Sequence, residues 1–187
     1  MDDLFLLFRY IAAVSHLRDS QENGHDSRVS VLCGRLATRM KLGALETHNI
    51  LLAAKLHDMG KAAVDECILW RKGPLNFLEM EEIRKHAAYG EQIALEIGLD
   101  KNIAYIIGQH HERWNGTGYP KELKEKEIVL GARMIAIVDS YDAMTTHRSY
   151  RKLLTVSEAL ADLTKLSGIN YDPEIVPVFA ELIHGTI

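Results

Sequence analysis

The apolar residues of this chain recur with a helical period almost from end to end, and this spacing restricts the fold more than any other feature. Leu, Ile, Val, Met and Ala return every three or four residues, which places them on one face of a helix. No stretch alternates convincingly between apolar and polar residues, as a half-buried strand would. A chain of 187 residues can bury one proper core, and a second full domain is not expected. We therefore predict one all-α domain, a bundle of about seven to eight helices.

Capping residues and glycines indicate where these helices begin and end. Asn76 with Glu79 and Thr155 with Glu158 have capping-box spacing. Left-handed residues are expected after helix ends at three glycines: Gly43, Gly98 and Gly168. The predicted helices cover 3–19, 25–42, 46–58, 77–97, 100–110, 128–145, 155–166 and 173–185. The segments 67–74 and 112–129 are predicted to be irregular because glycine and proline interrupt both.

Composition excludes several classes of protein. The 22 basic and 26 acidic residues give a net charge of -4, so no overall field attracts a nucleic acid polymer. The two cysteines have no CxxC spacing, which argues against a disulfide framework or a thiolate zinc site. The apolar run 4–14 is short and contains Arg9, which argues against a signal peptide or membrane span. We expect a cytoplasmic protein in which residues 1–20 form an amphipathic helix packed on domain 21–187; pairing with a second chain is left open.

Histidines and acids at the ends of predicted helices indicate a metal site. The segment KLHDMGK places His57, Asp58 and Lys61 close together, and Asp139 is an acid on an otherwise apolar helix. Five of the nine histidines lie at predicted helix ends: His25, His57, His86, His110 and His111. Each alone is more often structural, but together with two acids they favour metal binding. Imidazole and carboxylate ligands suit iron, manganese, zinc or nickel, and a shared carboxylate can bridge two ions.

Seven motifs follow one another along the chain: GHDSRV, KLHDMGK, KHAAYGEQI, QHHERWNGTGYP, ARMIAIVDSYDAMT, HRSYR and GINYDP. This ordered set, spanning about 24–179, resembles the HD-GYP family, a branch of the HD phosphohydrolase superfamily. The resemblance implies an HD-type helical bundle with an irregular GYP loop. It also implies a site for two or three metal ions, and hydrolysis of cyclic di-GMP to linear pGpG or to GMP.

The resemblance assigns the metal ligands position by position. One ion is assigned to His25, His57 and Asp139, and the other to His86, His110 and His111. Asp58 would bridge the two ions, whose shared water, as hydroxide, would attack phosphorus. Iron or manganese is favoured, with zinc, nickel or magnesium left open.

The resemblance also implies residues that meet the substrate. Lys61 would face the scissile phosphate, where it could offset negative charge or protonate the departing oxygen. Arg148 and Arg151 match two family arginines whose planar groups suit phosphate. Tyr119 belongs to the signature loop, which in the family shapes the site and serves partner contacts, such as those with diguanylate cyclase-type signalling domains.

Some positions depart from the family pattern. Gln21 stands where three-metal members have a glutamate, which favours a binuclear site here. Glu122, Glu125 and Val129 replace glycines and a proline after the signature, so the loop is expected to take another course or to be more helical. Two other readings are kept open: a cyclic dinucleotide sensor or interaction module without strong catalysis, and a phosphodiesterase for another nucleotide such as cyclic GMP-AMP.

Overall fold

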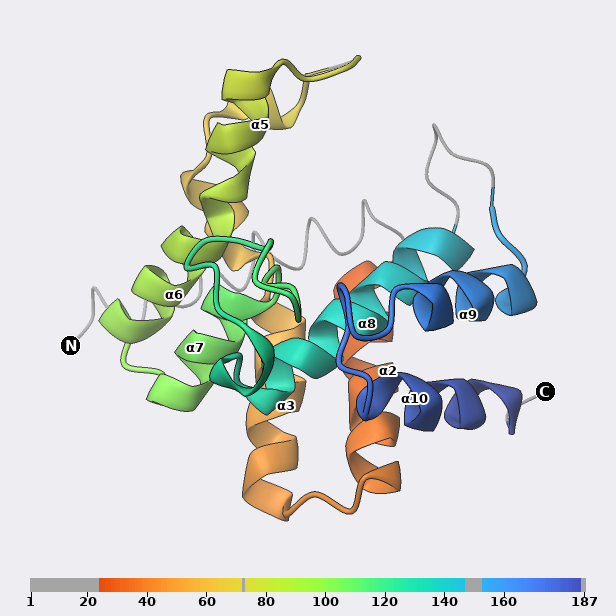
Figure 1. Cartoon of the computed structure of the whole chain (residues 1–187). Coiled ribbons are helices and arrows are strands. Elements are labelled where there is room, and N and C mark those ends of the chain that lie inside the picture. The colour runs from red at the N-terminus through yellow and green to blue at the C-terminus, as the bar shows by residue number, and fades with distance from the viewer. Residues whose placement is uncertain (1–23, 72, 147–152, 186–187) are drawn as a thin grey trace.

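The computed structural model describes residues 24–71, 73–146 and 153–185, and within these ranges it is helical with no strand (Figure 1). The all-α prediction is confirmed. The α-helices are α2 (His25–Arg39), α3 (Ala44–Leu56), α4 (Glu66–Leu69), α5 (Phe77–Arg84), α6 (His86–Glu96), α7 (Lys101–Gln109), α8 (Leu130–Thr145), α9 (Val156–Lys165) and α10 (Ile175–His184). Two 3-10 helices are η1 (Met59–Ala63) and η2 (Glu125–Glu127). The predictions for the N-terminal helix, Gln21, Arg148 and Arg151 lie outside the described residues.

Helix α8 is the central element of the core. Its residues Ala132, Met134, Ile135, Ile137 and Val138 are fully buried, as expected for a helix that is surrounded by other helices. Figure 1 shows α2 and α3 side by side as a hairpin, with α6 and α7 beyond α3 and with α9 and α10 on the opposite side. Helix α8 contacts helices of both sides. The apolar stripes predicted from the sequence therefore meet in one core.

The predicted helix 77–97 is wrong in one respect, because it is two helices. The chain bends at Lys85, and α5 projects from the body together with α4 (Figure 1). His86 explains the break: its Nδ1 lies 2.7 Å from the carbonyl oxygen of Ile83. The imidazole thus forms a hydrogen bond with a carbonyl oxygen in the last turn of α5, and α6 begins in a new direction.

The turn residues correct two further expectations. Gly98 and Gly168 have positive φ, as predicted, but Gly43 has φ -65 and caps the start of α3. The left-handed residue after α2 is Lys41, with φ 59. In the irregular loop, Glu122 and Glu125 have φ 54 and 49, so both keep the left-handed conformation that glycine adopts more easily. The loop nevertheless contains one short helical turn, because Glu125 begins the 3-10 helix η2.

No helix in the part of the chain that the structure describes is both long enough and apolar enough to cross a lipid bilayer.

Candidate metal centre

Four helix ends meet at one place and bring the five predicted histidines together. His25 begins α2, His57 caps the end of α3, His86 begins α6, and His110 and His111 follow α7. Neighbouring rings have centroid separations of 5.4 Å for His25 and His57, 5.2 Å for His57 and His110, and 5.0 Å for His86 and His111. Residues from distant parts of the sequence thus share one buried cluster.

The cluster divides into two groups with Asp58 between them. His86, His110 and His111 offer ligand atoms within 4.8 Å of one another. The second group consists of His25, Asp26, His57 and Asp58, and His25 Nε2 is 3.2 Å from Asp139 Oδ1. Asp58 Oδ1 is 3.5 Å from His86 Nε2, and its Oδ2 is 3.9 Å from His57 Nε2. One carboxylate therefore reaches both groups.

Backbone carbonyls set the orientation of three of the imidazoles. The Nδ1 atoms of His57, His86 and His110 lie 2.8, 2.7 and 2.6 Å from carbonyl oxygens three residues earlier. A carbonyl only accepts, so each Nδ1 carries the proton and each Nε2 keeps its lone pair. His86 Nε2 and His110 Nε2 are 3.3 Å apart, an unfavourable meeting of two lone pairs that a cation relieves. The donor set therefore fits a divalent metal ion.

Burial and neighbouring charges give His86, His110, His111 and Asp58 the protonation states that metal binding requires. Burial lowers the pKa of His111 to about 4 and also lowers the pKa values of His86 and His110. Burial alone would raise the pKa of Asp58, but the Lys61 ammonium beside it outweighs that effect and holds the pKa well below its usual value. Neutral imidazoles and a charged carboxylate are the ligand forms that bind metal.

Asp142 is a residue beside the cluster that the sequence interpretation missed. Its Oδ2 accepts a hydrogen bond from His25 Nδ1 at 2.7 Å, and its Oδ1 accepts from Arg28 Nε at 2.6 Å. Burial would lower the pKa of His25, but hydrogen bonds to Asp139 and Asp142 raise it to about 10. Asp142 follows Asp139 by three residues and so lies on the same side of α8, a spacing that could have indicated the pair. Outer carboxylates of this kind hold a ligating histidine in its productive orientation.

Asp26 is a second acid that was not predicted near the centre. Its Oδ1 lies 3.9 Å from Nδ1 of His57, but that nitrogen is the one bonded to the carbonyl of Ala54. Its carboxylate nevertheless offers an oxygen within 4.8 Å of ligand atoms of His25, His57 and Asp58, so Asp26 is a further possible ligand in that group.

Gly60 explains why the segment KLHDMGK can bring Asp58 against α6. A Cβ at Gly60 would lie 1.9 Å from the carbonyl oxygen of His86 and 2.4 Å from the backbone nitrogen of Gly90. Only a residue without a side chain lets η1 approach α6 this closely. Lys61, on the same short helix, forms an ion pair with Asp58.

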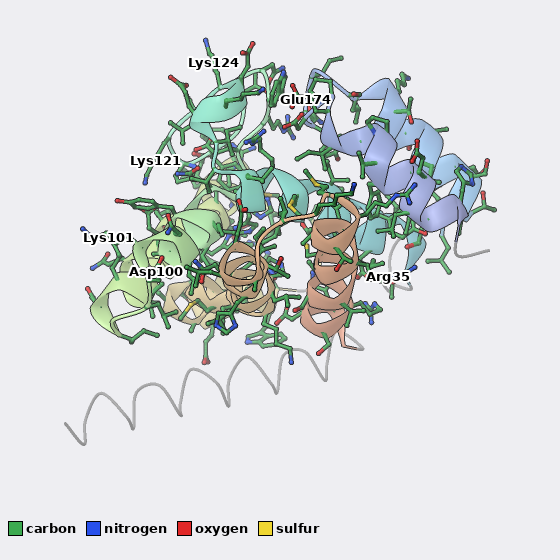
Figure 2. The ribbon with its side chains drawn as sticks, turned by 90° about the horizontal axis from the view of Figure 1, so that it is seen from below. Arg35, Asp100, Lys101, Lys121, Lys124 and Glu174 are labelled. Carbon is green, nitrogen blue, oxygen red and sulfur yellow. The ribbon has the colours of Figure 1, made fainter. Side chains whose placement is uncertain are left out.

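The irregular loop is anchored beside the centre by Glu112. This buried carboxylate accepts hydrogen bonds from the backbone nitrogens of Lys121, at 2.7 Å, and Leu123, at 3.1 Å. The loop thereby places the Tyr119 ring 4.9 Å from the His111 ring. Farther along the loop, Lys121 and Lys124 project outward (Figure 2). Tyr119 thus borders the metal centre, and the charged residues after it lie on the outer surface.

A groove of about 420 Å³ adjoins Tyr119, and its lining includes three cations and two acids, Glu81 and Glu122. Arg84, Lys85 and Arg113 line it, and the guanidinium carbon of Arg84 lies 5.4 Å from the centroid of the Tyr119 ring. Glutamates of α5 pair with Arg84 and Lys85, but exposed pairs of this kind are weak and a phosphate can displace them. The sequence interpretation named none of these three cations, although each lies within two residues of a predicted ligand.

Comparison with known proteins agrees with this geometry. The HD domain family matches residues 11–175. The chain belongs to the HD domain family. A cyclic di-GMP phosphodiesterase of Thermotoga maritima is 36% identical over 188 residues, which cover 97% of this chain and 50% of that protein. A 3'3'-cGAMP-specific phosphodiesterase of Vibrio cholerae is 36% identical over 151 residues, covering 81% of this chain and 33% of that protein.

Solved structures share the HD domain fold. An HDG"Y"P protein of Bdellovibrio bacteriovorus superposes with a TM-score of 0.70 at 24% identity, covering 87% of this chain and 52% of that one. The identification of an HD-GYP protein from its motifs is confirmed. The HD domain implies divalent metal binding, and the clustered histidines and acids agree with it. The chain spans at most about half the length of these relatives.

Proposed function

We propose that this domain is a metal-dependent phosphodiesterase that hydrolyses the 3'-5' phosphodiester bonds of cyclic di-GMP, yielding pGpG, GMP or both. The observation that carries the proposal is the position of Asp58 between two groups of imidazole and carboxylate ligands. A carboxylate that contacts two such groups suits two neighbouring ions, and paired ions are common in enzymes that cleave phosphate esters. The relatives that act on cyclic di-GMP support the choice of substrate.

The proposed site residues have different roles. The proposed ligands of one ion are His25, His57 and Asp139, those of the other are His86, His110 and His111, and Asp58 is shared. Divalent ions in this site would supply a Lewis acid and a water of lowered pKa; iron or manganese is our first choice for the native metal. Lys61 and the outer carboxylate Asp142 have supporting roles.

Lys61 and the cations of the groove are proposed to contact the phosphate groups of the substrate. The Lys61 ammonium pairs with Asp58, so it lies where it can offset charge on a phosphoryl oxygen or donate a proton to the departing ribose oxygen. Arg84 and Arg113 line the adjoining groove and can hold the second phosphate of the substrate. Arg148 and Arg151 are proposed to add phosphate contacts on the basis of their motif. Tyr119 would form one wall of the substrate site.

A second candidate is the hydrolysis of a mixed cyclic GMP-AMP dinucleotide. The Vibrio cholerae relatives specific for 3'3'-cGAMP are 32% to 36% identical to this chain, which is similar to the identity of the cyclic di-GMP phosphodiesterases. Contacts of the GYP loop with a diguanylate cyclase-type signalling domain are a further proposal, since the charged loop residues Lys121 and Lys124 face outward (Figure 2).

Product analysis tests the proposal. Protein loaded with iron or manganese is incubated with cyclic di-GMP and, separately, with 3'3'-cGAMP, and products are separated by chromatography. We expect pGpG or GMP from cyclic di-GMP, and no product with the Asp58→Ala variant. Turnover of 3'3'-cGAMP alone would favour the second candidate. Binding of cyclic di-GMP without any product would show a sensor rather than an enzyme.

A further inference from the structure

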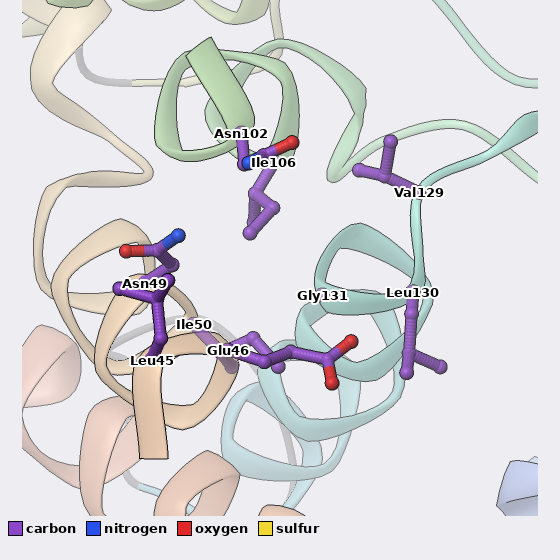
Figure 3. Close-up of a pocket in the computed structure, with 9 residues that line it drawn as sticks. All are labelled: Leu45, Glu46, Asn49, Ile50, Asn102, Ile106, Val129, Leu130 and Gly131. Atoms are coloured by element: carbon purple, nitrogen blue, oxygen red, sulfur yellow. The ribbon is translucent and has the colours of Figure 1, made fainter. Parts of the chain in front are cut away.

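Glu91 of α6 carries a mostly buried carboxylate that the proposed mechanism does not use. Helix α7 presents Asn102 and Ile106 to a cavity beside α3 and α8 (Figure 3), but its Gly108 faces Glu91. A Cβ at Gly108 would lie 2.1 Å from Oε2 and 2.8 Å from Cβ of Glu91, so the absence of a side chain there makes room for the glutamate. The Glu91 side chain is only 13% exposed. A carboxylate withdrawn from water in this way requires a cationic partner.

The partner is Lys121 of the irregular loop. Its Nζ donates to both carboxylate oxygens of Glu91, at 2.7 and 2.8 Å. The same ammonium lies 5.7 Å from the centroid of the Tyr105 ring on α7. Because the carboxylate is mostly buried and the ammonium lies near an aromatic ring, this contact is stronger than an ordinary surface ion pair. The side chain of Lys121 thus ties the loop to α6.

The backbone of Lys121 forms a second anchor. Its nitrogen donates to the buried carboxylate of Glu112 at 2.7 Å, and Glu112 follows the proposed ligand His111. Lys121 is therefore held by the end of α7 through its backbone and by α6 through its side chain. A single anchor would let the loop rotate about that point. Two anchors on different elements fix the orientation of the loop as well as its position.

Tyr119 depends on this double anchor because it lies two residues before Lys121. Only Pro120 separates them, and its ring fixes φ, so a shift of Lys121 moves Tyr119 too. The backbone nitrogen of Tyr119 donates to the carbonyl oxygen of His111 at 3.3 Å, and its side chain lines the groove proposed for the substrate. The position of this wall is therefore linked to Glu91.

We infer that the Glu91–Lys121 ion pair positions Tyr119 as a wall of the substrate site. Neither member of the pair is a proposed metal ligand, so both are positioning residues. That the ligand is cyclic di-GMP rests on the proposed function. Without the pair, the metal ligands stay in place but the wall is held less firmly. Such a change weakens binding of the substrate and of the transition state alike, so KM rises and kcat is kept.

Steady-state kinetics of the metal-loaded protein with cyclic di-GMP test the inference, together with hydrogen–deuterium exchange of the loop amides 117–123. Glu91→Gln should raise KM by about fivefold, as expected for the loss of one charged contact, with kcat unchanged and faster exchange in the loop. Gly108→Ala keeps both charges but displaces the Glu91 carboxylate, so it should act in the same direction. Lys121→Arg keeps the pair and should resemble the wild-type protein. Glu96→Gln, a change of another α6 carboxylate, which accepts from Gln92, is the matched control.

Three results would overturn the inference. An unchanged KM in Glu91→Gln, or unchanged exchange in the loop, would show that the pair does not position Tyr119. A lower KM in Glu91→Gln would show that the released Lys121 itself binds a substrate phosphate. Melting temperatures confirm that each variant is folded. If the wild-type protein does not hydrolyse cyclic di-GMP, the proposed function fails, and the variants are compared by calorimetric dissociation constants for cyclic di-GMP and by the same exchange measurement.

Discussion

Substituting Asp142 tests whether the outer carboxylate controls the metal centre. Asp142→Asn keeps the shape of the side chain but removes its charge. In the structure, this carboxylate accepts from His25 Nδ1 at 2.7 Å and from Arg28 Nε and Nη2 at 2.6 and 2.9 Å. An amide can replace only part of this pattern, so the His25 ring is held less firmly. Substitution of such outer partners typically weakens metal binding by about 10- to 100-fold.

The free energy of unfolding should also fall, by about 2 kcal/mol, since charge-assisted hydrogen bonds are worth about 1.5–3 kcal/mol each. The three hydrogen bonds to Asp142 do not add up to three times this energy. The Arg28 side chain is 34% exposed, so water replaces part of its contact with the carboxylate. The pKa of Asp142 is about 2: burial raises it, but the hydrogen bonds from His25 and Arg28 outweigh that effect. The carboxylate is therefore fully charged at neutral pH, and the substitution removes a full charge.

Calorimetric titration with manganese measures the affinity, and turnover is measured at increasing metal concentration. Activity of Asp142→Asn should recover when metal is in excess, because the residue positions a ligand and does not touch the substrate. Asp162→Asn, an exposed substitution on α9, is the matched control. Wild-type metal affinity in Asp142→Asn would refute the positioning role.

Three further predictions concern stability, and urea unfolding measures each. In metal-free protein, the pKa of His25 is about 10 in the folded state and 6.5 in the unfolded chain. The free energy of unfolding that protonated His25 contributes is therefore complete below pH 6.5 and declines toward pH 10, by up to about 1.4 kcal/mol per pH unit. A free energy of unfolding that does not change over this range would contradict the prediction. Gly60→Ala should lower the free energy of unfolding by about 1–3 kcal/mol, because the added Cβ would overlap the backbone of α6. Gly43→Ala is the control: the space around Gly43 is open, so this variant should change the free energy of unfolding by less than about 0.5 kcal/mol. Equal effects of the two substitutions would refute the packing argument. Glu122→Gly should stabilise the fold by up to about 1 kcal/mol, because φ is 54 at this position; a loss of stability would show that the side chain contributes more than the backbone conformation costs.

Most of the fold followed from helical periodicity and capping residues. The capping boxes at Asn76 and Thr155 are present as predicted, because the residues that form them are only three positions apart. The break at Lys85 was not predicted, since it depends on His86 taking the carbonyl of Ile83. Apolar periodicity continues through such a break and gives no sign of it.

The residues of the candidate site were likewise predicted only in part. The predicted imidazoles and the acids Asp58 and Asp139 are neighbours in the structure, although their metal roles remain proposals. Asp142 and the groove cations were missed because their importance depends on which residues face them across the fold. Lys41 took the left-handed conformation expected of Gly43, since the exact length of the α2–α3 turn is set by packing and not by the glycine alone.

The central claim is that Asp58 joins two ions in one hydrolytic centre. Elemental analysis of protein loaded with iron or manganese, combined with the rate of cyclic di-GMP hydrolysis on the same sample, tests it most directly. The account predicts two bound ions per chain and turnover in the wild-type protein, with loss of at least one ion and of all turnover in Asp58→Ala. Wild-type turnover in Asp58→Ala, or an active wild-type protein with no bound metal, would contradict it.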